Sequence, residues 1–274
     1  MARKYDSVLV TGASSGMGKD FAFRLLKDGY TVFAAARSVD KMRDLEEAGA
    51  IVIGMDIARD EDILAAVETI RERTGGVDIL INNAGFAQYG PVEETPVEKA
   101  RYQFEVNLFG LARLTQLLIP PMREKGKGLI INLSSMGGVI YTPMGAWYHA
   151  TKHAVEGWSD ALRFELEPFG IDVVILQPGI IRTGFVDTLD GHWQGDEAGP
   201  YGGMIRAVKE GAKDLYDSGK GSPPRVITDL MIQAVRADRP RTRYRAGYMG
   251  PVSMMARRLL PDRWFDRMLR AQAK

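Results

Sequence analysis

The chain of 274 residues contains no cysteine, which excludes disulfide bridges, thiolate zinc sites, iron–sulfur clusters and cysteine nucleophiles. Histidine is also scarce, with three residues, so a metal centre is poorly supplied with ligands. The sequence lacks any apolar run of the roughly 18 residues that a membrane-spanning helix needs. These absences exclude a protein that depends on thiols, on disulfides or on a membrane-spanning helix, and they favour an ordinary globular protein.

What is present supports one folded unit. Hydrophobic residues make up 45% of the chain and charged residues 26%, which rules out a disordered or collagen-like protein. Folds of the α/β class with this length commonly form one domain, so we expect a single domain over residues 1–274. The amino terminus offers only four residues, 7–10, before a glycine-rich turn, too short for the apolar region of a signal peptide. We therefore expect a cytoplasmic protein.

The formal net charge of +1 hides a basic carboxyl-terminal tail, residues 236–274, with eleven basic and three acidic residues. Such a tail can bind anionic partners, but the sequence shows no nucleic-acid recognition motif, and we expect no nucleic-acid partner. Its last part has the composition of a membrane-surface helix, although Pro261 splits it and Asp262 and Asp266 dilute its charge. We expect this tail to pack against the fold or a second subunit.

Short apolar strands alternate with helical stretches along the chain. The predicted strands lie at residues 7–10, 31–37, 50–55, 77–81, 129–133, 171–176 and 242–247, and the longer helices at 19–29, 60–73, 99–119 and 147–169. Strands that are apolar on both faces and alternate with helices are typical of a parallel sheet covered on both sides. The sequence therefore predicts an α/β protein with a doubly wound, mainly parallel sheet of about seven strands.

The alternation fails at residues 184–203, which combine glycines with a proline and three aromatic residues. We expect residues 184–274 to form a substrate loop and a carboxyl-terminal extension. Residues 184–203 are predicted to be a lid that closes over the substrate and excludes water. A permanently ordered surface loop is the alternative.

A glycine-rich turn follows the first predicted strand. Gly12, Gly16 and Gly18 have the spacing G-x-x-x-G-x-G, which permits a tight turn, close approach of a pyrophosphate and packing of the next helix. The alternative is an ordinary glycine-rich turn between a strand and a helix, with no role in binding a ligand. The same segment matches G-x-S-x-G, the elbow of a serine hydrolase, with Ser14 as nucleophile, which would need an acid and a histidine later in the chain.

Arg37 ends the second predicted strand, about where a dinucleotide fold places the residue that contacts the adenosine ribose. A guanidinium there suits a 2′-phosphate, which a carboxylate would repel. The position therefore favours NADP(H), although Asp40 lies close by and a solvated arginine is the alternative.

Tyr148 and Lys152 are four residues apart on a predicted helix, hence on one face. An ammonium about 4 Å from a phenol is worth roughly 4 kcal/mol at an effective dielectric of about 20, or about three pKa units. We therefore expect the pKa of Tyr148 near 7. General acid–base catalysis is efficient there, because the pKa is then close to the pH of the surroundings. His149 and His153 share this helix, but the segment lacks the glutamate of H-E-x-x-H, so we expect packing or surface roles and no metal.

In company with other segments, this pair resembles the short-chain dehydrogenase/reductase family. The resemblance runs in order through about residues 7–184 and rests on residues 11–18 (TGASSGMG), 82–85 (NNAG), Asn107, Ser134 with Ser135, the Tyr148-x-x-x-Lys152 pair, and Pro178 with Gly179. The resemblance implies a dinucleotide-binding fold and hydride transfer between a nicotinamide cofactor and an alcohol or ketone.

The family also implies roles. Tyr148 would exchange a proton with the substrate oxygen, Ser135 would hydrogen-bond that oxygen, Lys152 would hold the cofactor ribose, and Asn107 would position a relay water. The resemblance favours Ser135 over Ser134, because Ser135 precedes Tyr148 by thirteen residues, which is the family's spacing from serine to tyrosine. The implied cofactor contacts are Gly12, Ser14, Ser15, Gly16, Met17, Gly18, Arg37, Asp56, Ile57, Asn83, Ala84, Gly85, Tyr148, Lys152, Pro178, Gly179, Ile181 and Thr183. For Asp56, capping of the turn after a strand is the alternative.

The sequence indicates the substrate less directly than the cofactor. Candidate pocket residues are Phe86, Tyr89, Tyr141, Met144, Phe185, Trp193 and Tyr201, a set that suits a medium to large apolar alcohol or ketone. The extension resembles those of hydroxysteroid and retinol dehydrogenase-like members, and the family implies a homodimer or homotetramer through the helices with Asn107 and Tyr148. Two other functions stay open: a nonenzymatic NADP sensor on the same fold, and a hydrolase that uses Ser14.

Overall fold

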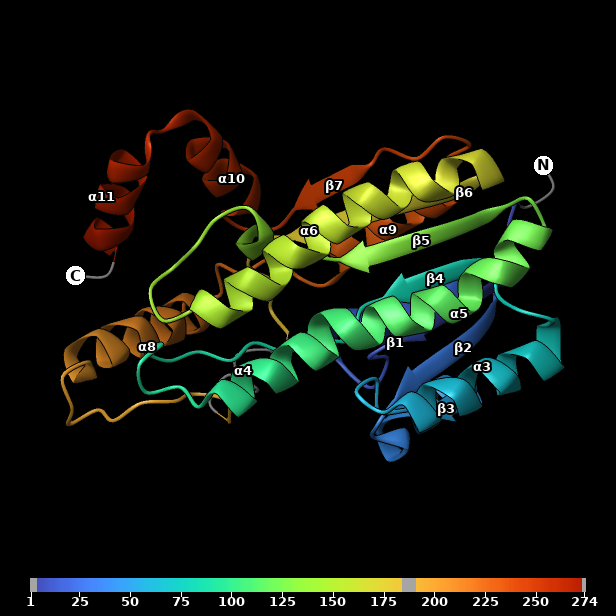
Figure 1. Ribbon diagram of the computed structural model, residues 1–274, viewed down its shortest axis with the longest axis horizontal. Helices are drawn as coiled ribbons and strands as arrows, with labels where there is room; N and C mark the ends of the chain where they lie inside the picture. Colours follow the sequence, from blue (N-terminus) through green and yellow to red (C-terminus); the bar gives the residue numbers. More distant parts are fainter. Residues whose placement is uncertain (1–3, 184–190, 273–274) are drawn as a thin grey trace.

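Seven strands form a parallel sheet in the computed structural model, which describes residues 4–183 and 191–272 (Figure 1). The order across the sheet is β3-β2-β1-β4-β5-β6-β7. The strands are β1 (Ser7–Thr11), β2 (Thr31–Ala36), β3 (Ile51–Gly54), β4 (Ile79–Asn82), β5 (Gly128–Leu133), β6 (Ile171–Pro178) and β7 (Arg243–Ala246). The predicted fold class and all seven predicted strands are confirmed.

The strands are buried because they carry apolar side chains toward both faces. In β1, Val8 and Val10 join one hydrophobic cluster and Leu9 joins the other, as expected when successive side chains alternate across a strand. All five residues of β1 are buried. The sheet is therefore covered by helices on both sides.

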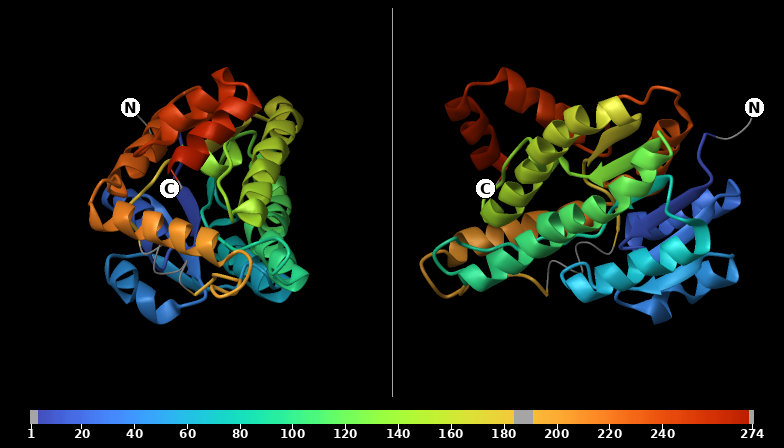
Figure 2. Two further views of the ribbon diagram at one scale, coloured as in Figure 1. Left: turned by 90° about the vertical axis from the view of Figure 1, so that its left-hand side faces the viewer. Right: turned by 45° about the vertical axis from the view of Figure 1, so that its right-hand side comes forward.

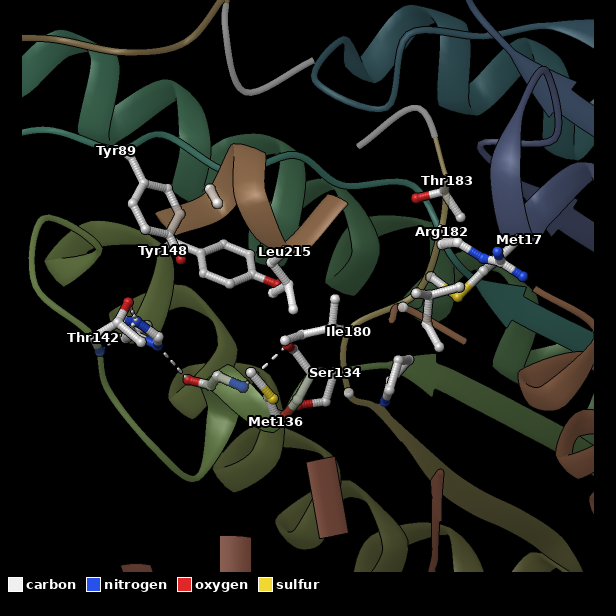
Figure 3. A pocket seen from close by; sticks show the side chains of 18 residues that line it. Met17, Tyr89, Ser134, Met136, Thr142, Tyr148, Ile180, Arg182, Thr183 and Leu215 are labelled. Atoms are coloured by element: carbon white, nitrogen blue, oxygen red, sulfur yellow. Dashed lines mark hydrogen bonds between the residues drawn. The ribbon is translucent and has the colours of Figure 1, made fainter. Parts of the chain in front are cut away.

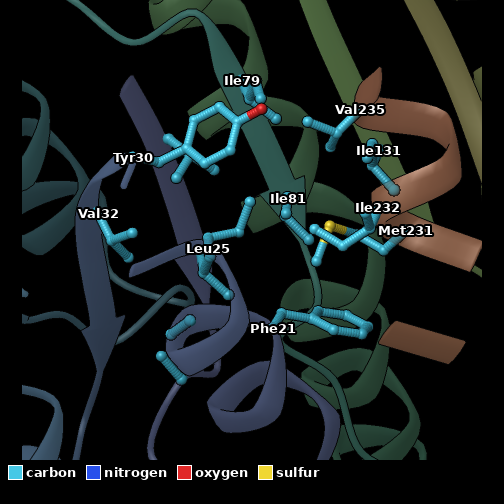
Figure 4. Close-up of a cluster of buried hydrophobic side chains, with 14 of the residues drawn as sticks. Phe21, Leu25, Tyr30, Val32, Ile79, Ile81, Ile131, Met231, Ile232 and Val235 are labelled. Carbon is cyan, nitrogen blue, oxygen red and sulfur yellow. The ribbon is translucent and has the colours of Figure 1, made fainter. Parts of the chain in front are cut away.

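Two helical layers cover the sheet. Helices α1 (Gly16–Lys27), α2 (Arg43–Glu47) and α9 (Arg225–Arg236) lie on one face, where Phe21, Leu25 and Met231 pack over the strands (Figure 4). Helices α3 (Asp60–Thr74), α5 (Gly110–Glu124) and α6 (Ala146–Leu166) lie on the other. The end-on view of Figure 2 shows the green and yellow-green helices α5 and α6 together on one side. This arrangement brings the carboxyl ends of the central strands to one edge, the usual place of a ligand site in such folds.

The predicted helix over residues 99–119 is not continuous. It consists of α4 (Val97–Phe104), a π-helical turn (Glu105–Phe109) and α5. A π-turn inserts one residue into the helix and is frequent at functional sites. Asn107 lies in this turn, and the periodicity of the sequence did not reveal the insertion.

The carboxyl-terminal third adds α8 (Gly202–Asp217), α10 (Gly250–Leu259) and α11 (Asp262–Gln272). Met254 of α10 and Phe265 of α11 pack on Ile140, in the segment after β5. The Tyr141 hydroxyl donates to Asp266 Oδ1 at 2.7 Å. The tail therefore packs against the fold, as expected, and the two helices meet at Pro261. Within residues 4–183 and 191–272, we find no helix with the length and hydropathy of a membrane span.

Four short helical segments complete the path: 3-10 turns at Val39–Met42, Met136–Gly138 and Glu167–Phe169, and the π-turn described above. The turn Met136–Gly138 follows β5 directly. Its position matters because Ser135, the N-cap of this turn, accepts a hydrogen bond from the Gly137 amide at 3.0 Å.

Candidate active site

A groove runs along the carboxyl ends of the central strands and gathers most of the predicted cofactor residues. Its lining includes Gly12, Ser14, Ser15, Gly16, Met17, Arg37, Asp56, Ile57, Asn83, Ala84, Gly85, Tyr148, Lys152 and Thr183. Pro178, Gly179 and Ile181 line an adjoining cavity instead, and Gly18 lies at the base of the glycine-rich turn. Residues from six separate segments are thus brought to one place.

The glycines of the turn are required by close contacts. Gly12 has φ +65°, and a Cβ there would stand 2.9 Å from Ala84 Cα. A Cβ at Gly18 would collide with the Asn83 side chain and the Gly12 carbonyl. Asn83 Nδ2 donates to the carbonyl of Thr11 at 2.9 Å, which fastens the turn to the end of β4. The turn is therefore held rigidly against the neighbouring strand.

Helix α1 begins at Gly16 with its amino terminus at this turn. Its first turn has no acidic residue, and within the described residues the Ser15 side chain makes no capping hydrogen bond. The first amide groups of a helix lack intrahelical partners and attract anions. The groove thus fits the diphosphate of a dinucleotide, which Ser14, Ser15, Gly16 and Met17 would hold.

Arg37 and Ser38 line the far end of the groove, after β2. Arg37 Nη1 lies 3.3 Å from the Tyr102 hydroxyl and donates a hydrogen bond to it. Asp56 also lines the groove, and its Oδ1 accepts from the Ala58 amide at 3.0 Å. The surroundings of Asp56 thus fit both interpretations, because the side chain caps the local turn and also lines the groove.

Tyr148 lies where the groove meets a second cavity and lines both. Burial raises the pKa of its phenol above the ordinary value, while a hydrogen bond with Ser135 acts in the opposite direction and Tyr89 adds to the rise. The expected pKa near 7 is therefore wrong for this structure. Desolvation of the phenolate outweighs the help that the sequence spacing promised from Lys152.

Lys152 is 7% exposed, and its Nζ donates to the Leu133 carbonyl at 2.8 Å. Burial lowers the pKa of Lys152 to about 8, with Glu156 opposing the shift. Burial thus acts on both groups: it raises the pKa of Tyr148 and lowers the pKa of Lys152. The spacing of the two residues along a helix does not encode this burial.

Asn107 is buried beside the site. Its Nδ2 donates to the Phe86 carbonyl at 2.9 Å and to Thr151 Oγ1 at 3.0 Å, and its Oδ1 accepts from the Phe86 amide at 3.0 Å. The side chain thus ties the segment after Gly85 to α6. Its role in a water relay stays a prediction.

The second cavity is partly open to solvent and has a mainly apolar lining. Figure 3 shows Tyr89 and Tyr148 together on one side, and Met17, Arg182 and Thr183 on the other. Aliphatic and thioether side chains supply much of the rest: Met136, Ile180, Ile181, Ala212 and Leu215. The cavity has room for an apolar substrate next to the Tyr148 phenol.

The aromatic residues expected in this cavity are mostly elsewhere. Tyr89 lines it, whereas Phe86 lines the cofactor groove. Tyr141 packs edge-on against Phe265, at 5.4 Å between ring centroids, and Trp193 packs against Tyr89 at 5.6 Å. Tyr201 donates to Glu93 Oε2 in an exposed position. Met144 is buried outside the lining set, and Phe185 lies outside the described residues.

His149 is buried and structural. Its Nε2 accepts from the Thr142 amide at 2.9 Å, so Nδ1 carries the proton and donates to the Gly137 carbonyl at 3.0 Å. Burial lowers the pKa of His149, which favours this neutral form. The imidazole therefore braces the loop after β5 against α6. Over residues 4–183 and 191–272 there is no cluster of three or more potential metal ligands.

The predicted lid is described in part, since residues 184–190 lie outside the described residues. Its later part is fastened to the segment after β4: Tyr89 and Trp193 form a parallel bridge, and the Gln194 amide donates to the Tyr89 carbonyl at 2.8 Å. The Asp196 amide donates to Glu94 Oε2 at 3.0 Å. Closure over a substrate stays a prediction.

Sequence reasoning missed several residues of the groove, among them Tyr102, Val106 and His192. Tyr102 and Val106 belong to α4 and the π-turn, and no motif marks them. His192 is a lone histidine in an irregular, glycine-rich segment, which gives no periodic signal. Only the fold brings these side chains to the cofactor residues.

Comparison with known proteins decides the family. The model of the short chain dehydrogenase family matches residues 6–192. The chain belongs to that family. It is therefore an oxidoreductase that acts on CH–OH groups with a nicotinamide cofactor.

Relatives extend over nearly the whole chain. A 3-ketodihydrosphingosine reductase from Bacteroides thetaiotaomicron is 33% identical over 96% of this chain and 96% of its own length. An NADPH-dependent 3-dehydrocapnine reductase from Ornithobacterium rhinotracheale is 33% identical over 95% of this chain and 94% of its own. In structure, a short-chain dehydrogenase from Streptomyces avermitilis aligns with a TM-score of 0.81 and 34% identity, covering 94% of this chain and 93% of that chain.

Proposed function

We propose that this protein is an NADPH-dependent reductase of medium to large, apolar ketones. The observation that carries the proposal is the position of Tyr148, which lines both the cofactor groove and the apolar cavity. A group at this junction can reach a substrate oxygen while the cofactor approaches from the other side. The proposal includes Ser135 as hydrogen-bond partner of that oxygen, since it lines the same cavity.

The protonation states suit reduction. A reduced nicotinamide, when bound, supplies the hydride that attacks the carbonyl carbon. Burial raises the pKa of Tyr148, so the phenol holds its proton and is ready to donate it to the developing alkoxide. Lys152 stays next to the groove, where its ammonium can donate to ribose hydroxyls. The mainly apolar cavity disfavours water, which limits loss of the hydride.

The preference for NADP(H) rests on Arg37, which lines the groove after β2 together with Ser38. A guanidinium and a hydroxyl are good donors to a phosphate monoester. Asp40, which left NAD open in the sequence, is not in the groove lining of the described residues. The Ornithobacterium relative, which is named NADPH-dependent, supports the same choice.

The substrate class follows from the lining of the cavity. Six aliphatic or thioether residues and Tyr89 line the cavity beside Tyr148, which favours an extended apolar chain over a small polar ketone. The Bacteroides relative is named a 3-ketodihydrosphingosine reductase, which is consistent with a long-chain ketone. A steroid- or retinoid-like substrate remains part of the same proposal.

We also propose a cytoplasmic homo-oligomer that assembles through the layer formed by α5 and α6. Large aromatic side chains are exposed on or next to these helices: Phe109 is 55% exposed, Phe164 66% and Phe169 42%. Exposed aromatic residues of this size are typical of protein interfaces.

A panel of ketones with NADPH tests the function. Consumption of NADPH should be measured with 2-alkanones of increasing chain length and with a bulky cyclic ketone, each repeated with NADH. We expect kcat/KM to rise with chain length and to be at least tenfold higher with NADPH. Binding of NADPH without turnover of any ketone would favour a sensor, and ester hydrolysis that is lost in Ser14→Ala would favour a hydrolase.

A further inference from the structure

His192 lies in the cofactor groove although it belongs to the irregular segment after β6. Its ring packs against Phe86, with centroids 4.7 Å apart and planes inclined by 40°. Its carbonyl accepts hydrogen bonds from the Tyr89 amide, at 3.3 Å, and from the Gln88 side chain. Backbone and ring are thus both held, and the imidazole is a built part of the groove wall.

A continuous row of contacts leads from His192 to Arg37. Phe86 packs against His192 on one side and against Tyr102 on the other, with 5.7 Å between the last two ring centroids. The Tyr102 hydroxyl accepts from Arg37 Nη1 at 3.3 Å. The imidazole and the guanidinium therefore flank one end of the groove.

Cationic groups converge at this end. Burial lowers the pKa of His192, and the charges of Lys99 on α4 and Arg37 after β2 lower it further. Among the described residues, these two are the charged groups that act on His192. His192 and Arg37 line the groove, and the charge of Lys99 acts on His192 from α4, so an anion bound at this end would be stabilised.

We propose that His192, together with Lys99 and Arg37, recognises the 2′-phosphate of NADP(H), and that it takes up a proton when this phosphate binds. The inference rests on the proposed use of NADP(H). The neutral imidazole is favoured while Lys99 and Arg37 face it without an anion, since like charges repel. A phosphate monoester carries nearly two negative charges at pH 7, which offset both cations and favour the imidazolium. NADH has a hydroxyl at this position and would cause no such uptake.

The test uses fragments of the cofactor that end before the nicotinamide, so it does not depend on catalysis. Adenosine 2′,5′-bisphosphate and adenosine 5′-monophosphate differ by the phosphate in question. Binding of each is measured by titration calorimetry at pH 7, in buffers of different ionisation enthalpy, which gives affinity and proton uptake together. The proteins are the wild type, His192→Asn and His153→Asn, whose histidine is exposed on α6.

We expect His192→Asn to weaken the bisphosphate about tenfold, the loss of one charge-assisted hydrogen bond, and to leave the monophosphate unchanged. The wild type should take up more protons with the bisphosphate than His192→Asn does, and His153→Asn should match the wild type. Comparison between proteins removes the contribution of the phosphate's own ionisation, which is common to all. Lys99→Met should also weaken only the bisphosphate.

Two results would overturn the assignment of His192. Equal weakening of both fragments in His192→Asn would show that the ring contacts the adenine, and unchanged affinity and proton uptake would show that it contacts neither. In both cases Arg37→Met should still lose preference for the bisphosphate, which keeps the cofactor proposal intact. A wild type that binds both fragments equally would instead contradict the use of NADP(H) and with it the role of His192.

Discussion

The two cavities that meet at Tyr148 are built in different ways. The cofactor groove takes its shape from the backbone: a glycine turn pressed against Ala84, a helix terminus and the ends of parallel strands. The substrate cavity takes its shape from side chains that come from distant segments, such as Met17, Met136 and Leu215. The shape of the cofactor groove is therefore fixed by main-chain geometry, whereas single substitutions can change the shape of the substrate cavity.

This difference separates chemistry from selectivity. Tyr148 and Lys152 sit on α6, which packs on the sheet, and Ser135 is the N-cap of the turn that follows β5. Leu215 and Ala212 sit on α8, in the carboxyl-terminal third. A protein built in this way can keep its reaction and change its substrate by altering α8 and the loops next to it. Substitutions in the two regions should therefore have separable effects.

The largest effect is expected at the junction itself. Tyr148→Phe removes the transferable proton and little else, so kcat should fall by about 10² to 10⁴ while the Kd of NADPH changes less than threefold. Steady-state kinetics and fluorescence titration with NADPH measure the two quantities. Retention of more than a few per cent of kcat would show that another group donates the proton.

A matched control is Tyr201→Phe. It removes a phenol hydroxyl that donates to Glu93 outside both cavities, so kcat should stay within about twofold of the wild type. An equal loss of kcat in both variants would mean that phenol hydroxyls act on the fold and not on the reaction.

A pair of charge substitutions tests whether the two regions are independent. Arg37→Asp should weaken NADPH at least tenfold and leave the KM of an apolar ketone unchanged, because it acts in the groove alone. Leu215→Asp should raise that KM at least tenfold without affecting the Kd of NADPH, because it places a charge in the apolar cavity. If each variant altered both constants alike, the division into two regions would be wrong.

A pair of glycine substitutions tests whether the main chain fixes the shape of the cofactor groove. Gly18→Ala adds a Cβ that meets the Gly12 carbonyl and the Asn83 side chain, so it should lower the free energy of unfolding by about 1–3 kcal/mol and weaken NADPH. Gly211→Ala in α8 has open space around the added Cβ and should raise the free energy of unfolding by about 0.5–1 kcal/mol. Urea denaturation measures both. Equal tolerance of the two substitutions would show that the turn is not held rigidly.

The last comparison concerns the free-energy cost of the buried lysine Lys152. Its pKa falls from 10.5 to about 8 in the folded chain, so the proton is held less tightly than in the unfolded chain. The resulting cost, roughly 3 kcal/mol at most, is full below pH 8 and shrinks as the pH rises toward 10.5. Part of this cost is offset by the bond to the Leu133 carbonyl.

Lys152→Met should therefore be about 1–2 kcal/mol more stable than the wild type at pH 7, and this gain should shrink by pH 10. The variant should also be inactive. Urea denaturation at pH 7, 8.5 and 10 measures the difference. A variant less stable than the wild type by the same amount at each pH would contradict the cost of burial.

The groove was largely predictable from the sequence because its parts are short and local. The spacing of Gly12, Gly16 and Gly18 and the end of the strand before Arg37 place side chains through backbone rules alone. The roles assigned to these residues remain predictions that the substitutions above test. The parallel sheet with helices on both faces followed from the same logic, since it was predicted from apolar strands that alternate with helices.

The substrate cavity and the electrostatics were not predictable in the same way. Tyr141 and Trp193 have the right chemistry for a pocket but are used for packing, and His192 gave no local signal. The pKa of Tyr148 depends on burial, which spacing along a helix does not encode. The π-turn that holds Asn107, whose side chain donates to Phe86 and Thr151, was likewise not revealed by the periodicity of the sequence.

Direct transfer of a labelled hydride tests the central claim most sharply. NADPH that carries deuterium on the transferable position of nicotinamide C4 is mixed with a long-chain ketone, and the alcohol is analysed by mass spectrometry. We expect one deuterium on the carbinol carbon with the wild type and almost no alcohol with Tyr148→Phe. Alcohol without deuterium, or an undiminished yield from Tyr148→Phe, would contradict hydride transfer at the junction of the two cavities.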